Sequence, residues 1–218
     1  MQGPKKAVVF DMDGVLLDTE KLYRMHWKKA GMEMGRTAAE MDSICERVAG
    51  GTKDNTKRVF AEAFGEDFSY MECRKRCYEM MGEYIEKNGV ELKPYVKEIF
   101  AHLKENRIKI ALATSTAREM ASERLKSVGI FDDFDAMVFG DMIEHGKPAP
   151  DIYLKACELL DVAPEDAIGV EDSINGVHSC HAAGLYTVMV IDLIKPTKEL
   201  FPYCNQIYAS LKEMLPLV

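Results

Sequence analysis

Four short polar stretches in this 218-residue chain each follow an apolar run. They are Asp11-Met12-Asp13-Gly14, Thr114-Ser115, Gly146-Lys147-Pro148 and Glu171-Asp172. Carboxylates that share one place repel one another unless a cation lies among them, and oxygen ligands without clustered His or Cys favour Mg²⁺. Magnesium sites of this kind commonly work together with a phosphate of the substrate. The sequence therefore predicts chemistry on a phosphorylated substrate.

The first pair of acids has the spacing for two different roles. Beside a metal ion, a carboxylate can attack phosphorus and form an aspartyl-phosphate. Asp11 directly follows its apolar run and is the predicted nucleophile. Asp13, two residues later, can protonate the leaving oxygen and later deprotonate water. The hydroxyls of Thr114 and Ser115, the ammonium of Lys147 and the free N–H groups of strand-to-helix turns would hold the phosphate.

Each stretch taken alone also has an ordinary structural explanation. An Asp-x-Asp-Gly sequence occurs in turns and in calcium loops. Thr114 with Ser115, or Asp172 with Ser173, could be helix N-caps, and Lys147 could be an exposed loop residue. The occurrence of all four stretches, in order, after successive apolar runs favours one shared site over these separate explanations.

The apolar runs indicate the elements that must position these residues. They are Ala7–Phe10, Ile108–Thr114, Ala136–Phe139, Ala167–Val170 and Thr187–Ile191. Their continuous apolarity predicts strands of a parallel sheet that is buried on both faces. Helical patterns lie between the last four runs, at Arg118–Val128, Asp151–Leu160 and Ile174–Ala183. The alternation predicts an α/β doubly wound parallel sheet with a Rossmann-like core, in which ligands bind beyond the carboxyl ends of the strands.

A long segment separates the first two predicted strands. It covers residues 11–107, whereas a crossover between parallel strands needs only about 12 residues. Four helical patterns fill it, at Glu20–Met34, Ala38–Val48, Lys53–Phe64 and Tyr70–Lys87. The sequence thus predicts an α/β core domain with the catalytic site, formed by residues 1–17 and 91–218, and an inserted all-helical cap domain, residues 18–90.

Four segments carry a resemblance to a known family. They are DMDGVLLDTE at 11–20, ALATST at 111–116, GKPAPDIY at 146–153 and GVEDSING at 169–176. The chain resembles the haloacid dehalogenase-like hydrolase superfamily, in the branch with a helical cap inserted after the first strand. Because the dehalogenase branch lacks the second acid of the first segment, Asp13 argues against halide chemistry.

The resemblance implies roles for individual residues. It makes Asp11 the nucleophile and Asp13 the general acid/base. It also makes Thr114 a catalytic residue that holds the phosphate, and Lys147 the catalytic residue that neutralises the nucleophile and the phosphoryl oxygens. The implied Mg²⁺ ligands are Asp11, Asp13 through its backbone carbonyl, Glu171 and Asp172. The candidates for binding the substrate or its phosphate are Ser115, Gly14, Tyr23 and Lys53.

The favoured function is a Mg²⁺-dependent phosphatase that hydrolyses a small phosphomonoester, such as a sugar phosphate, through an aspartyl-phosphate on Asp11. The alternative is a β-phosphoglucomutase-like phosphosugar mutase. Mutases of that type carry a His in the first cap helix, but this chain has Tyr23 at that position and its nearest His is His26. They also use two basic cap residues to bind the second phosphate of the sugar. Lys53 could be one of them, but the position expected for the second falls near Met80. These departures favour hydrolysis.

Two further functions remain as minor alternatives. A phosphonate-cleaving hydrolase would use a cap Lys in a Schiff base, but that branch also lacks the second acid that Asp13 provides. A non-catalytic binding protein would be expected to have lost some of the reactive residues, yet Asp11, Asp13, Lys147 and Asp172 are all present.

Composition limits the partners and the compartment. Lys plus Arg number 28 and Asp plus Glu 36, so the formal net charge of −8 argues against a nucleic-acid or membrane-surface partner. No stretch approaches the roughly 18 apolar residues of a membrane span, and the first ten residues do not resemble a signal peptide. Six cysteines form no disulfide pattern. We expect a cytoplasmic protein that binds a small phosphorylated metabolite and is compatible with a monomer.

Overall fold

The computed structural model describes residues 5–48, 53–65 and 67–218, except for the side chains of Lys53 and Asp54. The chain divides into two compact units. One unit contains the segment that ends at Asp18 together with Glu91–Val218, and the other contains Thr19–Val90. Each unit has its own core of buried apolar side chains.

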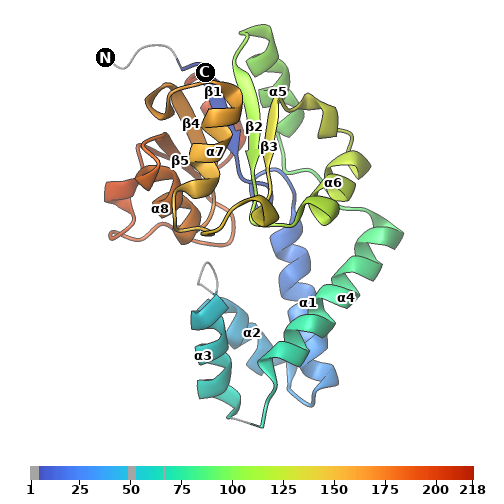
Figure 1. Ribbon diagram of the computed structural model, residues 1–218. Helices are drawn as coiled ribbons and strands as arrows, with labels where there is room; N and C mark the ends of the chain where they lie inside the picture. Colours follow the sequence, from blue (N-terminus) through green and yellow to red (C-terminus); the bar gives the residue numbers. More distant parts are fainter. Residues whose placement is uncertain (1–4, 49–52, 66) are drawn as a thin grey trace. The chain divides into compact units, whose positions relative to one another are not determined.

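The first unit is built on a parallel sheet (Figure 1). Its strands are β1 (Ala7–Phe10), β2 (Lys109–Ala113), β3 (Ala136–Val138), β4 (Ala167–Glu171), β5 (Tyr186–Val190) and β6 (Gln206–Tyr208). They lie in the order β3-β2-β1-β4-β5-β6, and every neighbouring pair is parallel. The predicted fold class is therefore confirmed.

Strand β1 lies inside the sheet, and its pairing with both neighbours fixes where the residues that follow it leave the sheet. Its four residues are buried on both faces, as their continuous apolarity predicts. Phe10 is paired with Leu112 of β2 on one side and with Val170 of β4 on the other. Because parallel strands in this register end at one edge, the segments after β1, β2 and β4 emerge next to one another.

Helices cover both faces of the sheet. They are α5 (Val96–Glu105), α6 (Arg118–Ser127), α7 (Asp151–Leu160) and α8 (Ile174–Ala182). Helices α7 and α8 share a buried cluster with Val9, whereas Phe100 of α5 contacts the Phe10 ring at 5.4 Å between centroids. Since successive strand residues point to opposite faces, these helices lie on opposite sides of the sheet.

Among the α-helices and strands of the described residues, α5 and β6 were not predicted from the sequence. Helix α5 buries Val96, Ile99, Phe100 and Leu103, a helical spacing that lies between the predicted cap and the second strand. Strand β6 has three residues at the edge of the sheet and is partly exposed, so it has no continuous apolar run. Every strand and helix that the sequence predicts exists, and none of their ends differs from the predicted one by more than one residue.

In the second unit, all the regular secondary structure of the described residues is helical. It consists of α1 (Thr19–Glu33), α2 (Ala38–Val48), α3 (Lys53–Phe64) and α4 (Tyr70–Asn88). Its core is aromatic: Trp27 stacks on Tyr70, and Phe60 contacts both rings. Cys73 and Cys77 lie fully buried in this core, and burial raises the pKa of each thiol to about 12. These cysteines therefore act as packing residues.

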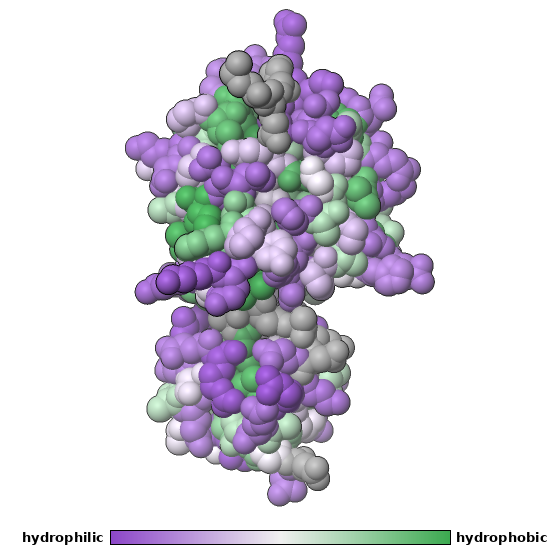
Figure 2. Space-filling model, turned by 90° about the vertical axis from the view of Figure 1, so that its left-hand side faces the viewer, coloured by the Kyte–Doolittle hydropathy of each residue, from purple (hydrophilic) through white to green (hydrophobic). Residues whose placement is uncertain are grey.

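The face in Figure 2 is largely hydrophilic, and its apolar residues form small, separate patches. In the part of the chain that the structure describes, each helix is too short or too polar to cross a lipid bilayer.

Candidate active site

Asp11 is the first residue after β1. Its backbone N–H donates to the carbonyl of Val170 at 3.0 Å, so it continues the pairing of β1 with β4 before the chain leaves the sheet. Its side chain is nearly buried, with a relative exposure of 8% for the residue. The strand pairing therefore fixes the backbone from which this carboxylate projects.

Lys147 reaches the same place from the segment between β3 and α7. Its buried ammonium donates to Asp11 Oδ1 at 2.6 Å, to Glu171 Oε1 at 2.5 Å and to the carbonyl of Ala113 at 3.0 Å. These bonds use all three of its donors. Burial alone would lower the pKa of Lys147, but the two adjacent carboxylates raise it above its usual range, so the side chain stays charged.

Glu171 is the last residue of β4 and is completely buried. Its Oε1 accepts from Lys147 and from the hydroxyl of Tyr153, the latter at 2.6 Å. Its Oε2 accepts from the backbone N–H of Asp172 and the hydroxyl of Ser173, both at 3.2 Å. Both carboxylate oxygens are thus bonded, and this carboxylate holds the Lys147 ammonium next to Asp11.

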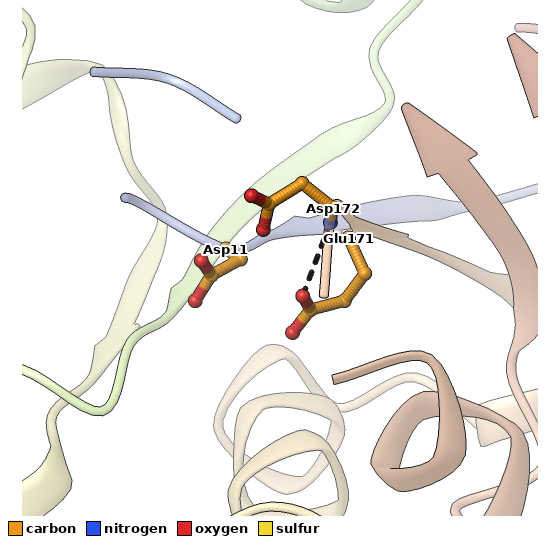
Figure 3. A group of neighbouring side chains, drawn as sticks. All are labelled: Asp11, Glu171 and Asp172. Carbon is orange, nitrogen blue, oxygen red and sulfur yellow. Dashed lines mark hydrogen bonds between the residues drawn. The ribbon is translucent and has the colours of Figure 1, made fainter. Parts of the chain in front are cut away.

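Three carboxylates gather at the ends of β1 and β4. Asp11, Glu171 and Asp172 each offer an oxygen atom, and these atoms all lie within 4.8 Å of one another. Figure 3 shows the three side chains next to one another. Gly14 makes this close packing possible, since a Cβ atom there would lie 2.1 Å from Asp172 Oδ2. The backbone φ of +83° at Gly14 also favours glycine.

The charges of this group fit a divalent cation. Burial raises the pKa of Asp11 to about 8; the neighbouring Glu171 and Asp13 carboxylates add to the increase, and Lys147 opposes it. Lys147 pairs with both Asp11 and Glu171, so one ammonium is shared between two buried acids. Hard oxygen donors at this spacing suit Mg²⁺ or a similar cation, which would favour the ionised form of every acid in the group.

Asp13 lies in the loop after β1 and has different partners. Its Oδ2 accepts from the hydroxyl of Thr116 at 2.8 Å, and its Oδ1 accepts from the guanidinium of Arg124 at 3.2 Å. Its carboxylate is not among the three that lie within 4.8 Å of one another. The side chain is therefore oriented by groups that follow β2, separately from the acids beside Lys147.

The residues after β2 form a turn at the same edge. Thr114 is buried, and its hydroxyl oxygen accepts from the N–H of Thr116 at 3.1 Å. The adjacent Ser115 is exposed. Gly140 passes so close to this turn that a Cβ atom there would lie 2.2 Å from the Ser115 carbonyl oxygen. Thr114 and Ser115 thus emerge beside Asp11, as the strand pairing requires.

The candidates from the helical segment belong to the other unit. Tyr23 lies on α1 and contacts Tyr78 edge to face, with 5.6 Å between ring centroids. Lys53 begins α3, and its side chain, like the preceding segment 50–52, lies outside the described residues. His26 is buried, with Nδ1 2.8 Å from the Leu22 carbonyl oxygen. The binding roles of Tyr23 and Lys53 remain predictions.

Sequence reasoning missed two residues that the structure places around this site. Tyr153 lies inside the quoted segment GKPAPDIY, but its bond to Glu171 crosses from α7 to β4. Arg124 lies in a predicted helix, and its contact with Asp13 joins residues far apart in the chain. The sequence signal for Arg124 was its place next to Leu125 on the apolar side of the helix, where a charged residue needs a partner.

Gly176 gives a test of the packing around Glu171. A Cβ atom at Gly176 would lie 1.9 Å from the Glu171 carboxyl carbon, so Gly176→Ala should destabilise the protein by about 1–3 kcal/mol through overpacking. Gly82, inside α4, has no heavy atom within 4 Å of such a Cβ. Gly82→Ala should therefore be neutral or stabilise by up to about 1 kcal/mol. Urea denaturation measures both, and equal effects would contradict this packing.

The chain is similar to known proteins in both sequence and fold. The family model for haloacid dehalogenase-like hydrolases matches residues 5–184. A phosphorylated carbohydrates phosphatase from Thermotoga maritima is 38% identical over 184 residues, 83% of this chain and 82% of that protein. A β-phosphoglucomutase from Bacillus subtilis is 31% identical over 193 residues, 85% and 83% of the two chains. The crystal structure of a provisionally assigned β-phosphoglucomutase from Thermotoga maritima superimposes with a TM-score of 0.77, at 33% identity and 97% coverage of both chains.

Proposed function

The chain belongs to the haloacid dehalogenase-like hydrolase family, and on this basis we propose that it is a Mg²⁺-dependent phosphatase acting on a small phosphomonoester of the sugar-phosphate class. The observation that carries the proposal is the Asp11 carboxylate at the end of β1, held 2.6 Å from a buried Lys147 ammonium and close to Glu171 and Asp172. The 38% identity to a phosphorylated carbohydrates phosphatase supports the same class of substrate.

The chemistry follows from the residues at the sheet edge. Asp11 Oδ attacks the phosphorus, and the bond from phosphorus to the leaving oxygen breaks while Asp13 donates a proton to that oxygen. Asp13 then takes a proton from a water molecule, which attacks the aspartyl-phosphate and releases inorganic phosphate and the free Asp11 carboxylate. Thr114, the Ser115 backbone and Lys147 hold the phosphoryl oxygens, and this electrostatic stabilisation supplies much of the rate.

Asp11, the Asp13 carbonyl, Glu171 and Asp172 are the proposed ligands of the metal ion. When bound, Mg²⁺ supplies positive charge that brings the acidic side chains and the anionic phosphate together. The grouping of three carboxylate oxygens within 4.8 Å of one another supports this assignment, because hard oxygen donors at this spacing suit a divalent cation.

We further propose that the helical unit serves as the cap domain and carries the residues that select the substrate, with Tyr23 and Lys53 as candidates. All six cysteines are free thiols, which supports a reducing cytoplasm as the place of action.

The second candidate function is a phosphosugar mutase, favoured by the 31% identity to a β-phosphoglucomutase. His26 supports hydrolysis instead. A mutase of the resembled type needs an accessible histidine in the first cap helix, whereas His26 is buried, bonded within its own helix and packed against Tyr84.

A panel of phosphomonoesters tests the proposal. We expect Mg²⁺-dependent release of inorganic phosphate, fastest with one sugar phosphate of the panel. β-Glucose 1-phosphate, with and without glucose 1,6-bisphosphate, tests the mutase. Glucose 6-phosphate formed faster than inorganic phosphate would replace the phosphatase by the mutase.

Removal of the metal should abolish turnover. A chelator such as EDTA is expected to lower phosphate release to background, and added Mg²⁺ should restore it. Because Mg²⁺ binds the folded protein, at 100 times its Kd it should also stabilise the protein by about 2.7 kcal/mol, seen as a higher Tm. Asp172→Asn should remove most of this stabilisation. Full activity in EDTA would rule out the metal assignment.

A further inference from the structure

Arg124 is a charged residue on the buried side of α6. Only about 4% of its surface is exposed, and it lies next to the buried Leu125. By contrast, Glu119, Glu123 and Lys126 on the same helix are exposed. An unpaired guanidinium in such a place is strongly unfavourable, because it has lost its hydration, so its location requires a specific partner.

The partner is the Asp13 carboxylate. Arg124 Nη1 donates to Asp13 Oδ1 at 3.2 Å, and Nη2 contacts the sulfur of Met120 at 3.0 Å. Within the described part of the chain, Asp13 is the acid at ion-pair distance from Arg124. The two residues are joined by tertiary structure, because Asp13 follows β1 and Arg124 belongs to the helix after β2.

A second donor completes the arrangement. The hydroxyl of Thr116, in the turn between β2 and α6, donates to Asp13 Oδ2 at 2.8 Å. Each carboxylate oxygen thus has its own donor, and together the two donors oppose rotation of the carboxylate. A proton-transfer group must lie within hydrogen-bond reach of the reacting oxygen, so this orientation matters for catalysis.

We propose that Arg124 is the positioning residue for Asp13, and the inference rests on the acid/base role proposed above for that residue. Arg124 neither gives nor takes a proton, since its guanidinium stays charged at all accessible pH values. It holds the Asp13 carboxylate where it can protonate the leaving oxygen in the first step and accept the proton of the attacking water in the second. The surface cation Lys126 on the same helix has no such role.

The test compares Arg124→Gln with the control Lys126→Gln, which makes the same charge change at the surface of α6. The substrate is p-nitrophenyl phosphate, whose leaving group needs no proton. We expect Arg124→Gln to release about one p-nitrophenolate per enzyme at nearly the wild-type rate, and then to turn over about 10- to 100-fold more slowly, because only the second step needs Asp13. A merely structural defect would reduce the size of the first burst instead. Lys126→Gln should match the wild type in both phases.

A second variant keeps the positive charge. Arg124→Lys places an ammonium under α6 but lacks the two-pronged guanidinium, so it should fold and turn over at a rate between those of the wild type and Arg124→Gln. If Arg124→Gln does not fold, Arg124→Lys carries the test. Steady-state turnover of Arg124→Lys equal to that of the wild type would then overturn the inference.

The Asp13→Asn background separates this inference from the proposed function. If Arg124 acts through Asp13, Asp13→Asn combined with Arg124→Gln should be no slower than Asp13→Asn alone, to within about twofold. The same additional loss in both backgrounds would refute the positioning role. Wild-type turnover of Asp13→Asn would instead remove the acid/base assignment, and the inference with it. A slow Asp13→Asn beside a fast Arg124→Gln would remove the inference only.

Discussion

Asp11→Asn is expected to lower the kcat for phosphomonoester hydrolysis by about 10⁴-fold or more, because the amide cannot form the aspartyl-phosphate. The substitution should leave the fold intact. Burial disfavours the ionised form of Asp11, so a neutral side chain of the same shape costs little in that position. We expect a Tm equal to or above that of the wild type when no metal is present.

Release of inorganic phosphate with Mg²⁺ measures this effect, and Asp132→Asn, at an exposed aspartate, is the control. The control should retain wild-type turnover. Full activity of Asp11→Asn would remove the nucleophile assignment. An active wild type that forms no acid-stable, base-labile phosphoprotein under rapid quenching would count against the covalent intermediate.

Lys147→Met should damage both catalysis and stability. The ammonium bonds to two buried carboxylates, so its removal leaves Asp11 and Glu171 without their shared cation. Breaking a buried pair in this way destabilises a protein by about 3–5 kcal/mol. Loss of the charge that stabilises the phosphoryl oxygens should lower kcat by about 10³-fold.

Urea denaturation and phosphate release measure the two effects of Lys147→Met. Lys155→Met on α7 is the control, since Lys155 pairs with Glu158 at the surface and should contribute less than about 1 kcal/mol. Adding Glu171→Gln to Lys147→Met should recover part of the stability, because one uncompensated acid is removed, but should not recover activity. A Lys147→Met variant with wild-type kcat would contradict the role of Lys147.

The architecture of the first unit could be predicted because its central strands are buried on both faces. Burial requires continuous apolar runs, and these runs are visible at β1, β2 and β4 in the sequence. The edge strand β6 escaped prediction for the same reason, since three half-exposed residues form no such run. A pattern of apolar residues indicates which elements are buried, and it gives no signal for an element that is exposed.

The site could be predicted only in part. Asp11, Thr114, Lys147 and Glu171 follow apolar runs, and the geometry of parallel sheets brings such residues together at one edge. The hydrogen-bond and ion-pair partners of each residue could not be predicted. The sequence grouped Glu171 with the metal ligands, whereas the structure adds that both its oxygens are bonded and that one holds Lys147.

The sequence by itself determined the class of fold, the family and which polar residues follow the central strands, because these depend on local patterns of apolar runs and on short motifs. Tertiary structure alone decided how charges are paired. The bonds from Arg124 to Asp13 and from Tyr153 to Glu171 join elements whose separation along the chain carries no pattern. Burial makes each unpaired charge or hydroxyl costly, so the packed fold selects partners across the sheet edge that no spacing in the sequence predicts.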